Sequence, residues 1–218
     1  MKFLPLILSF LFLCTSLPGQ DTKEMQELYN GSIWINSLAA VKGDQFLLSK
    51  SFMPGTITIM GKTYPVSLRY DIYEDQIQIP AGRFGLLQIN KLLVDSFSIS
   101  DRGKDMKFVP LKKDSIVGTK SFYNVLLEGS VSLYVKYVKK IDKLNTGGEN
   151  AEFYQVNRIL FVKDDEFFQV KRKKDLLQAM NDRKSEVRSF IRNHGLRIKQ
   201  SQPENLIPVI KYYGSLIR

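Results

Sequence analysis

"GTITIMGKTYPVSLRYDIYEDQIQI", residues 55–79, decides the fold of this chain. Apolar and polar residues alternate through it in three short runs, which is the period of β-strands that bury one face. Turn-forming residues separate the runs, so the stretch predicts three consecutive antiparallel strands. Their shared apolar face consists of Ile57, Ile59, Tyr64, Val66, Leu68, Tyr70, Ile72, Ile77 and Ile79.

Two turns set the expected register of these strands. Gly61-Lys62 has glycine first in a two-residue loop, which favours a type II′ turn, and Glu74-Asp75 forms the second turn. The facing pairs are then Ile59 with Tyr64, Ile57 with Val66, Ile72 with Ile77, and Tyr70 with Ile79. One apolar face survives both turns, whereas a slip of one residue would turn it toward solvent.

Three further hairpins follow the same pattern. They lie at 96–109 with a turn at DRGK, at 122–138 with a turn at Glu128-Gly129-Ser130, and at 153–170 with a turn at Asp164-Asp165-Glu166. In the second of them, Val125 faces Leu133 and Tyr123 faces Val135. We expect residues 20–170 to form an antiparallel β domain, a meander folded as a sandwich or a curved half-barrel.

The last part of the chain, residues 171–218, predicts a helical segment packed on the β domain. Within 175–193 the apolar residues fall on one helical stripe, formed by Leu176, Leu177, Met180, Val187, Phe190 and Ile191. Gly195 is typical of a residue that ends such a helix.

A second helix follows in this segment. Ser201 and Glu204 stand at the spacing of a capping box, and Pro208 should kink or delay the helix that they open. The predicted fold class is therefore α+β, mainly β, with an antiparallel meander followed by two C-terminal helices.

The chain begins with the three-part pattern of a secretory signal peptide. Lys2 precedes an apolar run over 3–13, and small or turn-forming residues follow. We expect residues 1–19 to be removed. The alternatives are a membrane anchor, for which the run is short, and lipidation at Cys14, which the bulky Leu13 disfavours.

Removal of this leader has consequences for chemistry and location. Cys14 is the only cysteine, so the mature chain would lack disulfides, a thiol nucleophile and cysteine metal ligands. No other apolar run is long enough to cross a membrane. We therefore expect an exported protein, periplasmic or secreted, without a transmembrane segment after signal removal.

The sequence contains no complete catalytic or metal-binding motif. His194, the single histidine, stands at a predicted helix end, where a capping role suits it better than that of a general base. Two acidic clusters have the residue types of a hydrolase or a Ca²⁺ site, but hairpin turns also favour such residues. The clusters are Asp71, Glu74 and Asp75, and Asp164, Asp165 and Glu166. We expect no catalytic, cofactor-binding or metal-binding residues. A non-enzymatic function is favoured over an enzymatic one.

The formal net charge of +10 permits an anionic partner. On the first predicted helix, Lys184, Arg188 and Arg192 recur every four residues and form a basic ridge. An anionic envelope surface would bind this ridge through its phosphates, and the alternative is a solvated helix face. We do not expect nucleic acid as a partner, because the chain carries an export signal and this segment lacks a stacking aromatic series.

Several stretches together resemble a family of exported proteins of the Bacteroidota type that has no assigned function. They are the leader ending near GQD, the meander at 55–79, the hairpin FYNVLLEGSVSLYVKYVKK at 122–140, and the closing LIPVIKYYGSL at 206–216. The resemblance implies an extracytoplasmic location and no particular activity. The expected architecture alone is also similar to that of periplasmic half-barrel lipoprotein carriers.

Three functions follow from these expectations. The first is a non-enzymatic extracytoplasmic binding or envelope-associated protein, supported by export, a β core and the lack of a nucleophile. The second is a periplasmic lipid or lipoprotein carrier, and the third is a hydrolase that uses acidic residues. An open apolar cavity would indicate the carrier, and carboxylates converging in one cleft would indicate the hydrolase.

Overall fold

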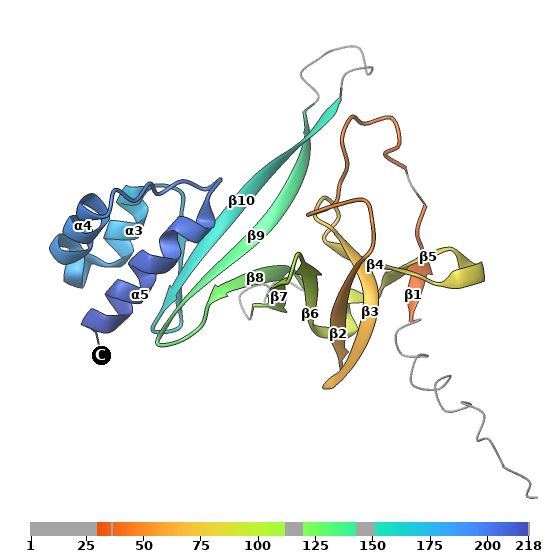
Figure 1. The fold of residues 1–218 in the computed structure, drawn as a ribbon, viewed down its shortest axis with the longest axis horizontal. Helices are drawn as coiled ribbons and strands as arrows, with labels where there is room; N and C mark the ends of the chain where they lie inside the picture. The colour runs from red at the N-terminus through yellow and green to blue at the C-terminus, as the bar shows by residue number, and fades with distance from the viewer. Residues whose placement is uncertain (1–29, 36, 112–119, 143–150, 218) are drawn as a thin grey trace, which may run out of the picture.

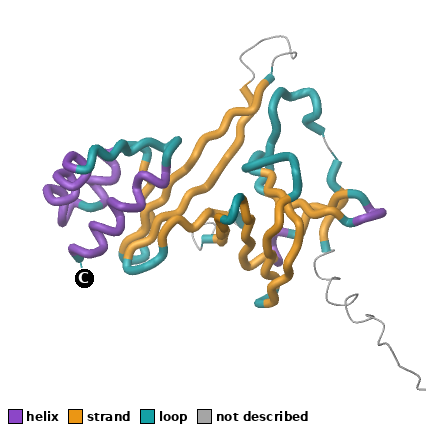
Figure 2. Tube along the Cα trace, viewed as in Figure 1, coloured by secondary structure: helices purple, strands orange, loops and turns teal. Residues whose placement is uncertain are grey.

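A computed structural model describes the chain over residues 30–35, 37–111, 120–142 and 151–217. It shows an antiparallel sheet of eleven strands that is not closed, followed by helices, and so confirms the predicted α+β, mainly β class. Figures 1 and 2 show the α-helices gathered at one end of the molecule. The predicted signal peptide, residues 1–19, lies outside the described residues. Among those that are described, no helix has the length and apolar character to span a bilayer.

The strands follow one another in space in the order β1-β5-β4-β3-β2-β6-β7-β8-β9-β10-β11. Their bounds are β1 (Gly31–Ile33), β2 (Met53–Ile59), β3 (Lys62–Asp71), β4 (Gln76–Pro80), β5 (Leu86–Ile89), β6 (Val94–Asp101), β7 (Lys104–Pro110), β8 (Phe122–Leu127), β9 (Val131–Asp142), β10 (Glu152–Lys163) and β11 (Glu166–Val170). Two short 3-10 helices, η1 (Gly82–Phe84) and η2 (Lys91–Leu93), stand on either side of β5.

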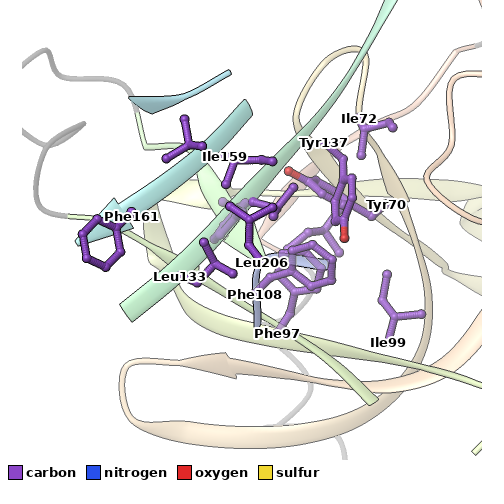
Figure 3. Close-up of a cluster of buried hydrophobic side chains, with 14 of the residues drawn as sticks. Tyr70, Ile72, Phe97, Ile99, Phe108, Leu133, Tyr137, Ile159, Phe161 and Leu206 are labelled. Atoms are coloured by element: carbon purple, nitrogen blue, oxygen red, sulfur yellow. The ribbon is translucent and has the colours of Figure 1, made fainter. Parts of the chain in front are cut away.

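The sheet is strongly curved, and the contacts of Tyr70 show it. β3 lies four strands from β8, which in a flat sheet corresponds to about 19 Å. Yet the ring centroid of Tyr70 on β3 lies 6.4 Å from that of Phe122 on β8. Phe97 of β6 and Phe108 of β7 fill the space between these two rings. Their ring centroids lie 5.0 and 5.3 Å from that of Tyr70. Buried aromatic rings therefore occupy the inside of the curve (Figure 3).

Residues 42–47, here called the bridging segment, connect strands that are not neighbours in the sheet. On one side, the backbone N–H of Ile72, just after β3, donates to the carbonyl of Gln45 at 3.0 Å. On the other side, the N–H of Lys42 donates to the carbonyl of Ala151 at 2.8 Å, next to β10. The segment thereby fixes the end of β3 relative to the start of β10.

The first hairpin turns at Met60-Gly61, and the prediction of a turn at Gly61-Lys62 is wrong. Both residues of the turn have positive φ, 50° and 77°, which is the pattern of a type I′ turn and not of type II′. Ile57 consequently faces Tyr64, two residues away from the predicted register. A shift of two leaves every side chain on its predicted face, because side chains alternate with a period of two.

The second turn is also shifted by two residues. The β3–β4 turn has four residues, 72–75. Ile77 therefore faces Tyr70, whereas the prediction paired Ile77 with Ile72. Asp71 accounts for the wider turn, because its Oδ1 accepts hydrogen bonds from two backbone N–H groups of the turn, at 2.9 Å each. The predicted apolar face nevertheless forms, and of its nine members all but Val66 are buried.

The turns of two later hairpins are where the sequence predicts them, whereas the β8–β9 register is wrong. Leu127 faces Leu133, so that the loop is wider than expected. A bulge between Val125 and Leu127 then shifts the rest of β8 by one residue, and Val125 faces Tyr134. The shift turns Asn124 inward, where its side chain is buried and hydrogen-bonded.

The helical elements are α3 (Lys173–Ala179), η3 (Asn181–Arg183), α4 (Lys184–Asn193), η4 (Pro203–Leu206) and α5 (Ile207–Leu216). The predicted continuous helix over 175–193 is thus broken. Its apolar stripe is correct, since five of the six members are buried and Phe190 is half-buried. Asp182 explains the break, because its carboxylate accepts hydrogen bonds from the hydroxyl of Tyr213 at 2.9 Å and from Nζ of Lys163 at 3.1 Å.

The later helix boundaries agree with the sequence in two of three respects. Gly195 follows α4 with a φ of 60° and the hydrogen bonds of a Schellman motif. α5 begins at Ile207 with Pro208 in its first turn, so the predicted delay is confirmed. The Ser201 capping box is wrong, because η4 is preceded by Gln202 and has no side-chain cap. After the sheet, the described residues therefore form three α-helices, where two were predicted.

Truncation of Phe108 tests the packing inside the curve. This side chain is fully buried, and its ring stacks on that of Phe97 with centroids 4.6 Å apart. We expect Phe108→Ala to lower the free energy of unfolding by about 3–5 kcal/mol, because it leaves a cavity in the core. Tyr154→Ala, at an exposed aromatic residue of β10, should cost only about 0.5 kcal/mol. Urea unfolding measures both, and equal losses would contradict this role of Phe108.

Candidate functional site

The structure places the three predicted site residues, Lys184, Arg188 and Arg192, along one flank of α4. All three side chains are exposed, and none forms an ion pair within the described ranges. The adjoining stripe of the helix, with Val187 and Ile191, is buried. The cations therefore face outward while other residues hold the helix in place.

The basic ridge belongs to the most basic part of the chain. Residues 171–217 contain eleven Lys and Arg residues and only four Asp and Glu residues, so most of the net charge of +10 lies at the helical end. The single histidine lies at the end of α4. His194 is the C-cap of α4, its Nδ1 lies 2.9 Å from the carbonyl oxygen of Phe190, and its ring packs on that of Phe190 at 4.1 Å. The predicted capping role is confirmed.

The two acidic clusters do not come together. Asp71 is fully buried, its Oδ2 accepts a hydrogen bond from Gln45 at 3.0 Å, and burial raises the pKa of its carboxyl. Asp164 and Asp165 form the β10–β11 turn with φ of 51° and 60°. Asp75 contacts Lys136 on β9, which faces Arg158 on β10, and Arg158 lies six residues, or about 20 Å, before that turn. The described part of the chain has no group of three or more His, Cys, Asp or Glu side chains placed for a metal ion.

A pocket with polar and apolar walls, here called the edge pocket, lies at the β1 edge of the sheet. It has a volume of about 520 Å³ and is open to solvent. β1, β4, β5, η2 and the residues beside them supply its walls. Its polar lining includes Asn30, Gln76, Gln88, Asn90, Lys91 and Lys120.

Next to this pocket, Asp75 gathers two lysines and a tyrosine into what we call the Asp75 network. Oδ2 of Asp75 lies 3.0 Å from Nζ of Lys136 on β9 and 3.5 Å from Nζ of Lys91 on η2. Its Oδ1 accepts a hydrogen bond from the hydroxyl of Tyr70 at 2.5 Å. Burial, reinforced by the charge of Asp75, raises the pKa of Tyr70 well above its usual value, so the hydroxyl keeps its proton and acts as the donor.

The sequence predicted neither the edge pocket nor the Asp75 network, and it placed Asp75 in a turn and in an acidic cluster with Asp71 and Glu74. The reason is distance along the chain, since Lys91 and Lys136 come from segments that no local pattern connects to residue 75. A weak signal did exist in the amides of Gln76 and Gln88. Gln76 alternates with Ile77 on β4, and Gln88 stands between Leu87 and Ile89 on β5, which marks a polar face.

Asp75→Asn tests the importance of the network. Asn tolerates the positive φ of 58° at this position, so the substitution removes charge without changing the backbone preference. Two partly buried lysines would lose their carboxylate, and we expect the free energy of unfolding to fall by about 2–4 kcal/mol. Asp101→Asn, in an exposed ion pair with Arg102, should cost about 0–1 kcal/mol. Urea unfolding distinguishes the two, and a loss at Asp75 no larger than that at Asp101 would contradict the assignment.

Comparison with family models, with curated proteins and with solved structures found no match for this chain. The resemblance to exported Bacteroidota-type proteins therefore stays a prediction, and a function has to be argued from the geometry.

Proposed function

We propose that this chain is an exported, non-enzymatic binding protein that associates with an anionic envelope membrane through its basic helical end. The observation that carries the proposal is the exposed ridge of Lys184, Arg188 and Arg192 on a helix whose adjoining stripe is buried. Export, predicted from residues 1–19, would bring the ridge to surfaces of this kind.

The strength of such an attachment follows from the number of cations. Each Lys or Arg near an anionic membrane surface contributes about 1 kcal/mol, and the attraction weakens as salt screens it. Three cations give a modest, reversible attachment rather than an anchor. This weak binding suits a protein that moves between a surface and the surrounding solution.

A periplasmic lipid or lipoprotein carrier is the second candidate. The curved, open sheet favours it, because a carrier needs a concave apolar surface. Against it, the rings of Tyr70, Phe97 and Phe108 fill the inside of the curve, and none is more than 2% exposed. Lipid found by native mass spectrometry in the purified protein would favour the carrier over membrane attachment alone.

Replacement of the ridge cations with Gln tests the membrane proposal. The triple variant Lys184→Gln, Arg188→Gln, Arg192→Gln should bind anionic vesicles about 10- to 100-fold more weakly at low salt. Its melting temperature should stay nearly unchanged, because the ridge is exposed and the helix is held by its buried stripe. Vesicle co-sedimentation and thermal unfolding provide the two measurements.

A second triple variant separates the ridge from net charge. Arg102→Gln, Lys104→Gln and Lys107→Gln remove three exposed cations from the β6–β7 hairpin. This variant has the same net charge as the ridge variant and should retain vesicle binding. If both variants bind as the wild type does, or if both lose binding equally, the ridge has no specific role.

Export has its own test. The mature protein should begin near Gln20 and be found outside the cytoplasm, because signal peptidase would remove the leader. N-terminal sequencing of protein purified from cells, together with fractionation, measures this. An intact Met1 on the cellular protein would refute the export part of the proposal.

A further inference from the structure

The edge pocket has a distinct electrostatic character. Lys91 and Lys120 belong to its lining, and within the described part of the chain no Asp or Glu does. The remaining polar groups of the lining are amides and the hydroxyl of Ser32. A cavity with two ammonium groups, several amides and no carboxylate favours an anion over a cation.

The carboxylates near the pocket do not neutralise its lysines. Asp75 forms ion pairs with both Lys91 and Lys136, so one negative charge has to balance two positive charges. Lys120 donates to the carbonyl of Leu92 at 3.0 Å, which is a neutral acceptor, and burial lowers the pKa of its ammonium. The charge of Asp95 acts against this lowering of the Lys120 pKa, and Oδ2 of Asp95 also accepts a hydrogen bond from the backbone N–H of Gly61 at 2.7 Å.

One group in the pocket lacks a donor. The Oε1 atom of Gln76 is buried and accepts no hydrogen bond from the described residues. A buried acceptor without a partner is unfavourable. Because this oxygen is not exposed to the pocket, the Gln76 amide must rotate toward the pocket before a hydroxyl group of a ligand can relieve it. The pocket thus has positive charge for an anionic group and, in the same lining, an unused acceptor for a hydroxyl.

We propose that the edge pocket binds a small hydroxylated anion, of the class of sugar acids and sugar phosphates, with its charged group at Lys91 and Lys120 and a hydroxyl at Gln76. The volume of about 520 Å³ lies within the usual range of small-molecule sites. The site is independent of the proposed membrane attachment. β1 and β5 lie at the end of the molecule opposite to α4 (Figure 1).

Isothermal titration of the full-length mature protein tests the proposal with three probes of similar size. Glucuronate supplies a carboxylate, glucose 6-phosphate supplies a phosphate, and glucose is uncharged. We expect at least one of the two anions to bind at least about tenfold more tightly than glucose, because a charge-assisted contact is worth a factor of that order. The tighter of the two anions identifies the charged group. Failure of both anions to bind at about 10 mM, or equal binding of glucose, overturns the proposal.

Two variants locate the binding. Lys120→Gln should weaken binding of the preferred anion by about tenfold or more, while Lys104→Gln, an exposed lysine on β7, should leave it unchanged. Gln76→Leu should remove the preference for glucuronate over cyclohexanecarboxylate, which has the same charge without hydroxyl groups. Melting temperatures confirm that the variants fold. Wild-type affinity in Lys120→Gln, or an unchanged preference in Gln76→Leu, would show that the pocket is not the site.

Discussion

The packing of Tyr70 against β6, β7 and β8 is the constraint on which the rest of the structure depends. A ring on β3 touches a strand four positions away only if the sheet bends toward it. The bend brings the β3–β4 turn to β9, where the backbone N–H of Lys139 donates to the carbonyl of Ile72 at 3.0 Å. The same ring carries a hydroxyl that needs a partner in the interior, and Asp75 supplies it. One side chain therefore links the apolar core to the charged network.

The outer face of β3 and β4 shows how the bend is maintained from the other side. Arg69 places its guanidinium 4.0 Å from the ring centroid of Phe46 and 5.0 Å from that of Trp34, while its Nε donates to Gln78 at 2.8 Å. These contacts hold Trp34 and Phe46 over a face that in many antiparallel sheets meets solvent. Near β3, the polar residues on that face therefore contact the loop that covers it. At β5 and β1, the polar residues of the same face line the edge pocket instead.

The sequence predicted what depends on local periodicity and missed what depends on distant partners. Alternation identified the buried face, but a two-residue slip leaves alternation intact, so only turn chemistry at Met60-Gly61 could have fixed the register. The bulge in β8 has no periodic signature. The break before α4 depends on Asp182 meeting Tyr213, far along the chain. The basic ridge was predictable because it lies on one helix. The edge pocket was not, because Lys91, Lys120 and the glutamines of its lining come from segments that no local pattern connects.

The Asp75 network also explains how the ammonium group of Lys91 can be held in place at the edge pocket and still be available to bind an anion. Lys136 is the closer partner of Asp75, at 3.0 Å, and Lys91 is the looser one, at 3.5 Å. If Lys91 turned toward an anion in the pocket, Asp75 would keep Lys136 and the hydroxyl of Tyr70, so no buried charge would be left alone. The carboxylate orients Lys91 without neutralising it, because it cannot balance two ammonium groups. A bound anion would supply the missing negative charge and, by mass action, would stabilise the fold that assembles the network.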